Sequence, residues 1–271
     1  MSLTVGAATY AWLWDRPLEY AIERIAELGF RNFEIMTAPP HVWPRGMDAA
    51  ARRALRRHYE RLGLTLTSLN PTFLDLNMVS PNPGIREETL RQFHEQFELA
   101  ADLGAGLVVI TVGKKHPLIA PHFEFFWRQA VDGAKQILPL CEQTGVTFGV
   151  ENGWTVFTHA KHCADFVAEL RHERLKIVFD VANATIVNES PLAGLEAVKD
   201  HLALVHLSDT DDKTWGHNPV GTGMIDFAAV ATKLNAIGYD GVSILEVVTR
   251  QAPERHFKES LERLWAYGWA P

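Results

Sequence analysis

The sequence predicts a (β/α)8 barrel, formed by one domain that spans residues 1–271. Short apolar runs with the character of strands alternate with amphipathic, helix-like stretches along the whole chain. Glycines recur between a helix-like stretch and the next strand-like run. A chain of 271 residues that is 47% hydrophobic also has the size and apolar content for one large barrel with a continuous core.

Eight runs have the composition of strands, and several are nearly continuous in Val, Ile and Leu. Such runs are typical of parallel strands that are covered on both faces. They are 3–10, 31–37, 64–70, 107–113, 146–152, 175–181, 202–209 and 242–248. Eight strand–helix units in about 250 residues is the usual size of this barrel.

Apolar residues between these runs recur at helical spacing, for example over 18–28, 90–100 and 227–237. Five glycines then separate a helix pattern from the following strand: Gly29, Gly63, Gly104, Gly145 and Gly238. Glycine in this place supplies the left-handed backbone conformation that ends many helices.

A doubly wound open sheet is the rival fold for alternating strands and helices. It commonly carries a GxGxxG sequence after its first strand, and no such sequence follows residues 3–10. The GTG at 221–223 is too short and lies in a long predicted loop. The barrel is therefore the favoured interpretation.

Composition argues against several classes of protein. The formal charge of −7, from 26 basic and 33 acidic residues, disfavours binding to nucleic acid phosphates. No run approaches the ~18 apolar residues of a membrane span, and residues 1–10 do not have the pattern of a signal peptide. Cys141 and Cys163 fall on predicted helices, so a disulfide framework is not expected. We expect a reduced, soluble, cytoplasmic protein.

Polar side chains occur near the carboxyl ends of four successive predicted strands. Glu151 ends the fifth run and Asp180 the sixth, while His206 lies in the seventh and Glu246 in the eighth. In a barrel these ends open onto one face, so we expect the four side chains to meet there. A single acid in such a place is more often a helix N-cap or the partner of an arginine.

Three carboxylates that gather in a barrel mouth would repel one another. Burying even an unpaired polar group costs roughly 2–7 kcal/mol, and an unpaired charge costs more. One bound divalent cation would replace this repulsion with attraction. Oxygen ligands with one imidazole suit Mn²⁺, Mg²⁺, Co²⁺ or Zn²⁺, and we favour Mn²⁺.

Five motifs give the chain a resemblance to a known family. They are VEN (150–152), FDVAN (179–183), VHLSD (205–209), HNPVGTGMIDF (217–227) and GYDGVSILEV (238–247). In their order and spacing, the chain resembles the xylose isomerase-like sugar isomerases and epimerases over nearly its whole length. This group includes D-tagatose 3-epimerase, hydroxypyruvate isomerase, inosose-processing and endonuclease IV-type relatives.

The resemblance implies a metal-dependent isomerase or epimerase that acts on a small sugar, keto-sugar or keto-polyol. It implies that Glu151, Asp180, His206 and Glu246 are the metal ligands. The expected chemistry passes through an enediolate that the metal stabilises. Glu151 and Glu246 are the expected catalytic residues, each working on one face of the substrate.

The chain departs from the family pattern at two positions. Many relatives carry His three residues after the strand-six Asp, where this chain has Asn183. Endonuclease-type relatives carry Asp two residues before the loop His, where Trp215 precedes His217. A three-metal cluster is therefore expected to be incomplete, which disfavours DNA repair, and substrate specificity is expected to have shifted.

Six residues are candidates for substrate contact: Asn183, His217, Glu34, Asn70, Lys114 and Trp12. Several have equally good alternatives. Glu34 would also suit an ion pair at the bottom of the barrel or facing a helix, Asn70 a turn, and Trp12 the packing of a loop lid. Lys114 is one of two adjacent lysines, which on a loop are more often solvated.

Three other functions compete with the isomerase or epimerase. A lyase of the same fold would dehydrate a keto-polyol or a dehydroshikimate-like acid through the same intermediate. A non-catalytic sugar-binding barrel would lack the metal, and an endonuclease would cleave DNA. We expect a small carbohydrate-like substrate and no nucleic acid or membrane partner; a homo-oligomer stays open.

Overall fold

A computed structural model describes residues 2–71, 75–153 and 156–271, and it confirms the barrel. In this part of the chain nine parallel strands form one sheet, in the order β2-β3-β4-β5-β6-β7-β8-β1-β9. Each predicted strand run contains one of the first eight strands. They are β1 (Leu3–Ala8), β2 (Asn32–Met36), β3 (Thr65–Asn70), β4 (Leu107–Ile110), β5 (Thr147–Glu151), β6 (Leu175–Asp180), β7 (Leu202–Leu207) and β8 (Val242–Leu245).

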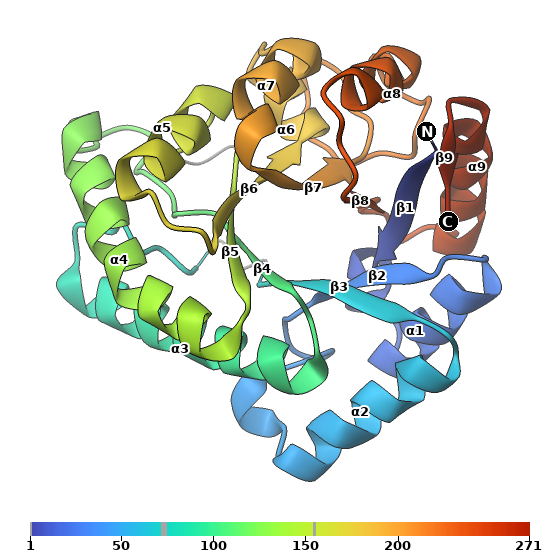
Figure 1. Cartoon of the computed structure of the whole chain (residues 1–271), viewed down its shortest axis with the longest axis horizontal. Coiled ribbons are helices and arrows are strands. Elements are labelled where there is room, and N and C mark those ends of the chain that lie inside the picture. The colour runs from blue at the N-terminus through green and yellow to red at the C-terminus, as the bar shows by residue number, and fades with distance from the viewer. Residues whose placement is uncertain (1, 72–74, 154–155) are drawn as a thin grey trace.

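Helices follow the strands and form the outer ring of the barrel (Figure 1). The predicted periodic stretches coincide with α1, α3 and α8. The α-helices are α1 (Leu18–Glu27), α2 (Ala49–Arg61), α3 (Pro83–Leu103), α4 (Phe123–Thr144), α5 (Ala160–Leu170), α6 (Val181–Ile186), α7 (Pro191–Val198), α8 (Phe227–Ala236) and α9 (Pro253–Ala266). The two short helices α6 and α7 share the connection from β6 to β7.

The barrel closes because β1 pairs with both β8 and β2. Residues 4–7 of β1 pair with β8, and Ala7 and Ala8 pair with β2. The short strand β9 (Trp269–Ala270) adds to the opposite end of β1, at Leu3 and Thr4. The two ends of the chain therefore lie beside each other (Figure 1).

The five glycines between helices and strands have the left-handed backbone that the sequence predicts. Their φ angles lie between 71° and 96°. Gly104 and Gly145 directly follow α3 and α4, and their amides bond to carbonyl groups of the last helical turn. These glycines turn the chain from the helix into the next strand.

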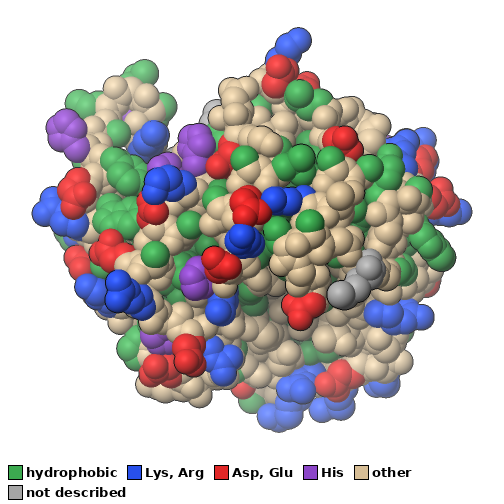
Figure 2. Space-filling view, turned by 45° about the horizontal axis from the view of Figure 1, so that its top comes forward, with side chains coloured by type: hydrophobic (Ala, Val, Ile, Leu, Met, Phe, Trp, Pro, Cys, Tyr) green, Lys and Arg blue, Asp and Glu red, His purple; other side chains and the backbone are tan. Residues whose placement is uncertain are grey.

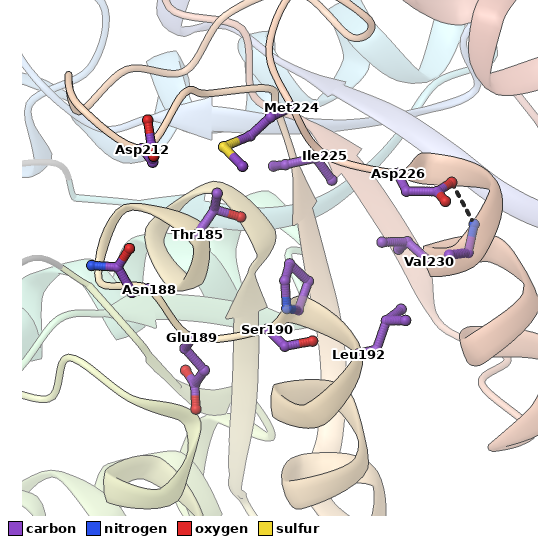
Figure 3. A pocket seen from close by; sticks show the side chains of 12 residues that line it. Thr185, Asn188, Glu189, Ser190, Leu192, Asp212, Met224, Ile225, Asp226 and Val230 are labelled. Atoms are coloured by element: carbon purple, nitrogen blue, oxygen red, sulfur yellow. Dashed lines mark hydrogen bonds between the residues drawn. The ribbon is translucent and has the colours of Figure 1, made fainter.

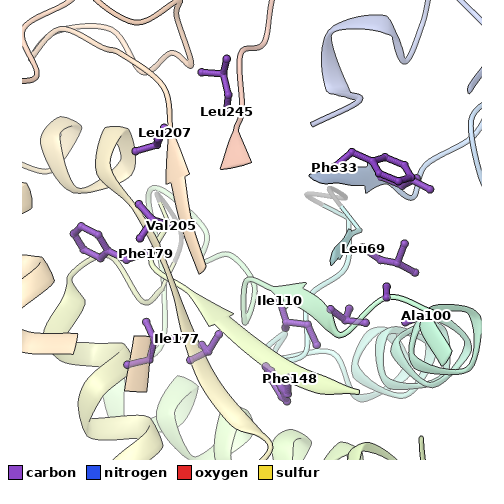
Figure 4. Packing of buried hydrophobic residues seen from close by; sticks show 14 of the residues in the cluster. Phe33, Leu69, Ala100, Ile110, Phe148, Ile177, Phe179, Val205, Leu207 and Leu245 are labelled. Atoms are coloured by element: carbon purple, nitrogen blue, oxygen red, sulfur yellow. The ribbon is translucent and has the colours of Figure 1, made fainter. Parts of the chain in front are cut away.

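Alternating side chains along the strands divide the core into two parts. Phe179, Val205 and Leu245 belong to the large cluster between strands and helices, and Figure 4 shows its packing. Val178, Leu204 and Ile244 belong to a separate small cluster inside the barrel. Each of these three precedes a predicted metal ligand by two residues. Because side chains two apart share one face of a strand, the ligands also point into the barrel, one layer above.

Charged side chains are mixed on the surface. Acidic and basic groups are interspersed on the face that Figure 2 shows, and some charged residues form exposed ion pairs, such as Lys161 with Asp165. Cys141 and Cys163 are buried free thiols. None of the helices described here has the length and apolar character that crossing a membrane requires.

Candidate metal centre

Glu151, Asp180, His206 and Glu246 meet inside the barrel, as the sequence predicts. Each offers one ligand atom, and these atoms all lie within 4.8 Å of one another. Glu151 and Asp180 end β5 and β6, His206 lies in β7, and Glu246 follows β8 directly. All four side chains are buried, with at most 6% of any residue exposed. Three carboxylates and one imidazole in so small a volume form a group that could hold a divalent cation.

The two oxygens of Asp180 have different surroundings. Oδ1 accepts a hydrogen bond of 2.7 Å from the backbone N–H of Asn183 and so caps α6. Oδ2 is buried without a hydrogen-bond partner, and it lies 3.6 Å from His217 Nδ1 and 4.0 Å from His206 Nδ1. Asp180 is therefore an N-cap and also presents to the cluster one oxygen without a hydrogen bond, which faces the imidazole of His217. Such an oxygen fits a cation.

His206 lies between two carboxylates. Its Nδ1 is 2.6 Å from Glu151 Oε1, and its Nε2 is 3.2 Å from Glu34 Oε2. Burial alone would lower the pKa of His206, but the negative charges of Glu34, Glu246 and Glu151 raise it well above its usual value. A metal at Nδ1 would have to displace a proton from this nitrogen.

Glu34 contacts His206 Nε2 and holds the imidazole in place. Its side chain is fully buried and accepts hydrogen bonds from Ser68 Oγ at 2.6 Å and from Asn70 Nδ2 at 3.1 Å. With His206 it forms an ion pair in the barrel interior. Within the described part of the chain, Glu34 therefore pairs with a residue of the cluster, and not with a partner at the bottom of the barrel or on a helix.

Glu246 is held at both oxygens. Asn70 Nδ2 lies 3.2 Å from Oε1, and His217 Nδ1 lies 3.1 Å from Oε2. Ser208 Oγ also lies 3.0 Å from the same nitrogen of His217. Burial would raise the pKa of Glu246, but His206 and His217 outweigh burial and lower it. In turn, burial would lower the pKa of His217, but Glu246 and Asp180 raise it to about 9.

The pKa of Glu151 shifts upward, in the direction opposite to that of Glu246. Burial raises its pKa to about 7, and the attraction of His206 only partly opposes this shift. Its neighbour Asn152 joins the ends of β5 and β6, because its amide accepts from the backbone N–H of Asp180 at 2.8 Å and donates to the carbonyl of Asp180 at 3.0 Å. The sequence reasoning did not select Asn152, although it lies inside the VEN motif.

Asn183 and His217, two of the predicted substrate residues, lie beside the cluster. The side chain of Asn183 donates to the carbonyl of Asn152 at 3.2 Å and accepts from Trp215 Nε1 at 2.8 Å. Trp215 also meets His217 edge to face, with ring centres 5.8 Å apart. The loop between β7 and α8 therefore reaches back over the end of β6.

The structure does not bring Trp12 or Lys114 to the cluster. Trp12 is buried in a short 3-10 helix (Tyr10–Trp12), where its ring packs 4.9 Å from that of Phe257 and its Nε1 donates to Glu254 Oε1. Both partners belong to α9. Lys114 is exposed after β4, and its carbonyl accepts from Asn77 Nδ2. The local sequence does not predict the orientation of the 3-10 helix that carries Trp12 or the path of the β4–α4 loop. It therefore could not place Trp12 or Lys114 relative to the cluster.

A separate cavity of about 460 Å³ lies between α6, α7 and the start of α8 (Figure 3). Thr185, Leu192 and Met224 line it, together with acidic groups such as Asp226. Asp226 already caps α8 through a hydrogen bond to the amide of Ala229. None of the four predicted ligands lines this cavity, so it is distinct from the candidate metal centre.

Comparison with known proteins gives the chain its family. Residues 22–267 match the model of the xylose isomerase-like TIM barrel family. A D-psicose 3-epimerase of Ruminiclostridium cellulolyticum is 23% identical over 254 residues, which cover 88% of this chain and 80% of the relative. A fructoselysine 3-epimerase of Shigella flexneri is 21% identical, with 92% and 93% of the two chains covered.

Two further similarities concern the alternative function and the fold. An inosose dehydratase of Erwinia tasmaniensis is 26% identical over 211 residues, which cover 66% of this chain and 70% of the relative. A crystal structure of D-psicose 3-epimerase with D-tagatose, from Clostridium cellulolyticum H10, superposes with a TM-score of 0.82 at 19% identity. That match covers 99% of this chain and 100% of the other. The chain belongs to the xylose isomerase-like TIM barrel family.

Proposed function

We propose that the protein is a divalent-metal-dependent epimerase that acts on a ketose or a related small keto-sugar. The convergence of Glu151, Asp180, His206 and Glu246 within 4.8 Å carries this proposal. Relatives that are sugar epimerases, at 21% and 23% identity, support the reaction class. We further propose Mn²⁺ as the bound ion; three carboxylates and one imidazole suit it, as they also suit Mg²⁺, Co²⁺ and Zn²⁺.

The residues present fit a bound cation on two grounds. The buried Oδ2 of Asp180 has no hydrogen-bond partner, and two further buried carboxylates, Glu151 and Glu246, belong to the same cluster. When bound, a divalent cation supplies positive charge that stabilises the negative charge developing on substrate oxygens. Glu34 contributes by fixing the ring of His206, so that Nδ1 faces the cluster.

Glu151 and Glu246 are the proposed proton-transfer groups. They come from β5 and from the end of β8, so they approach the centre from different sides of the barrel mouth. One carboxylate removes the proton from the carbon next to the carbonyl, which gives an enediolate. The other returns a proton to the opposite face of the same carbon. The configuration at that carbon is inverted, and the roles exchange for the reverse reaction.

Asn70 and His217 orient one of these two groups. They contact the two oxygens of Glu246 from opposite ends of the carboxylate. A carboxylate held in this way keeps a constant direction toward the substrate carbon, which proton transfer requires. This position is the structural basis for proposing Asn70 and His217 as part of the site.

Dehydration is the second candidate, because an inosose dehydratase is among the relatives. Loss of a β-hydroxyl from the same enediolate would lower the mass of the product by one water. Product analysis by mass spectrometry separates the two reactions. The acidic charge of the chain gives no support to an endonuclease.

The proposed reaction is tested with a panel of D-fructose, D-tagatose and D-psicose, each incubated with the Mn²⁺-loaded protein in D₂O. We expect an epimer that carries deuterium at the inverted carbon. The substitution Glu246→Gln should remove most of the turnover, roughly 10²-fold or more. The exposed Glu262→Gln on α9 is the matched control and should keep wild-type rates. Full turnover in Glu246→Gln would refute the two-glutamate scheme.

A further inference from the structure

The two departures from the family pattern contact each other in this structure. Trp215 lies in the loop between β7 and α8, and Asn183 lies in the first turn of α6. The indole Nε1 donates a 2.8 Å hydrogen bond to Asn183 Oδ1. The side chain that replaces a histidine therefore anchors the side chain that replaces an aspartate.

The indole is also tied to the metal centre through both of its neighbours. The backbone N–H of Asn183 bonds to Asp180 Oδ1 at 2.7 Å. On the other side, the ring of Trp215 meets His217 at 72°, and His217 Nδ1 lies 3.1 Å from Glu246 Oε2. A single intervening residue therefore connects Trp215 with each of two proposed metal ligands: Asn183 with Asp180, and His217 with Glu246.

Trp215 keeps part of its surface open. It is 38% exposed, whereas its neighbour Asn183 is 5% exposed. Its polar N–H is satisfied by Asn183, so the open part of the ring is largely apolar and flat. A flat apolar surface beside a polar centre is a usual wall of a small-molecule site, and it complements the C–H face of a sugar.

One cation near this mouth is already paired with a carboxylate. Arg250 lies in the loop after β8, but Asp15 holds its guanidinium through two bonds of 2.7 and 2.9 Å. Asp15 comes from the loop after β1, so this exposed pair links the loops that follow β8 and β1. A phosphate group would have to compete with the Asp15 carboxylate to bind the guanidinium of Arg250.

We propose that Trp215 is a specificity-determining wall for the C–H face of an uncharged ketose, and that Asn183 is the positioning residue that sets the indole. This inference rests on the proposed epimerase function. It assigns the substrate class to unphosphorylated sugars. It also gives a joint role to Asn183 and Trp215 at the positions where the chain departs from its family.

The test measures kcat and KM for D-fructose, D-tagatose and D-psicose with Mn²⁺-loaded protein. Trp215→Ala should raise KM about fivefold or more, with kcat changed less than about threefold, because an equal contact in ground and transition states is lost. Trp265→Ala, which removes an exposed tryptophan on α9, is the matched control and should leave both constants unchanged. Bound metal, measured by elemental analysis, should be equal in all variants.

Asn183 is tested by a double-mutant cycle. Trp215→Phe keeps an aromatic ring but removes the N–H, and Asn183→Leu removes the acceptor. If Asn183 acts through the indole, the two KM increases should be non-additive, so the double variant should resemble the single variants. Additive increases would show a separate structural role for Asn183 and would overturn its assignment as the positioning residue.

Three results would contradict the inference. A KM for Trp215→Ala less than about fivefold above wild type, in a protein that epimerises the ketoses, would overturn the role of Trp215 as a wall but not the proposed epimerase function. A kcat/KM for D-fructose 6-phosphate about tenfold above that for D-fructose would overturn the uncharged substrate class. If the wild-type protein converts none of the three ketoses, the proposed function fails and the inference fails with it.

A direct binding readout is ketose-dependent quenching of tryptophan fluorescence, which Trp215→Phe should abolish.

Discussion

The Nε2 of His206 lies 3.2 Å from Glu34 Oε2, and both side chains are fully buried. Glu34 comes from β2 and His206 from β7, so the contact crosses the interior of the barrel. A carboxylate that binds the outer nitrogen of an imidazole fixes its tautomer and its orientation. The opposite nitrogen, Nδ1, is then directed at the cluster.

This relationship predicts that Glu34 controls metal affinity without binding the metal. Glu34→Ala should weaken Mn²⁺ binding about 10–100-fold, because the imidazole loses its orientation and basicity. Competition with a chromophoric chelator measures the affinity. The exposed Glu262→Ala should bind as tightly as wild type. An unchanged affinity in a folded Glu34→Ala protein would refute the supporting role.

Asp180→Asn should separate stability from metal binding. Asparagine can still cap α6, but it removes the charge at the unpartnered Oδ2. The metal-free variant should therefore be more stable than metal-free wild type, by about 1–3 kcal/mol. It should gain little from added Mn²⁺, whereas wild type gains about 2.7 kcal/mol at a hundredfold excess over Kd. Urea denaturation with and without chelator measures both effects.

A variant that is less stable than metal-free wild type would contradict this reading of Asp180. So would a variant that retains the full stabilisation by Mn²⁺. Asp226→Asn is the matched control, because Asp226 caps α8 in the same way but lies outside the metal centre. Its Mn²⁺-dependent stabilisation should equal that of wild type.

The pKa shifts predict that the metal-free protein loses stability as pH rises. Burial raises the pKa of Glu151 from 4.5 to about 7, so its ionisation in the folded state is penalised increasingly between those values. The raised pKa of His206 acts in the same direction, since the favourable charge is present at low pH and is lost as pH rises.

Metal binding should have the opposite pH dependence. The cation competes with protons on Glu151 and His206, so Mn²⁺ affinity should rise with pH, about tenfold per unit for one displaced proton. Thermal unfolding from pH 5 to 8, with Mn²⁺ or with chelator, measures both trends. The gap between the two melting temperatures should widen with pH, and a constant gap would contradict the proton competition.

The sequence predicts the barrel and the cluster well because both depend on regular features. Strand runs and glycine C-caps repeat along the chain, and parallel strands bring their carboxyl ends to one face. Asp180, His206 and Glu246 lie at corresponding places on consecutive strands, so their meeting follows from the topology. Asp180 also shows that the N-cap interpretation does not exclude the metal interpretation, because the cap uses only Oδ1.

Contacts between distant segments are not predictable in the same way. Glu34 and His206 are 172 residues apart, and their pairing depends on the tilt and closure of the sheet. Trp12 is a candidate for substrate contact or for loop packing, and its ring packs against Phe257, a partner that only the position of α9 supplies. The bond from Trp215 to Asn183 depends on an irregular loop, for which periodicity carries no information.

Asn152 provides a further prediction, because it ties the backbone of Asp180 to the end of β5. Asn152→Ala would leave the buried N–H and C=O of Asp180 without these partners. Stability should fall by about 1–3 kcal/mol, and Mn²⁺ affinity should fall as well. Asn235→Ala, which removes one amide-to-carbonyl bond within α8, should reduce stability less and leave Mn²⁺ affinity unchanged. Equal Mn²⁺ affinity in both variants would argue against a role for Asn152 at the centre.

The most direct measurement is anomalous X-ray scattering at the manganese edge from crystals soaked in Mn²⁺. The account predicts one strong peak inside the barrel, roughly 2.0–2.3 Å from an atom of each of Glu151, Asp180, His206 and Glu246. A peak bound elsewhere, or no peak in crystals with an accessible site, would contradict the metal centre from which the proposed reaction follows.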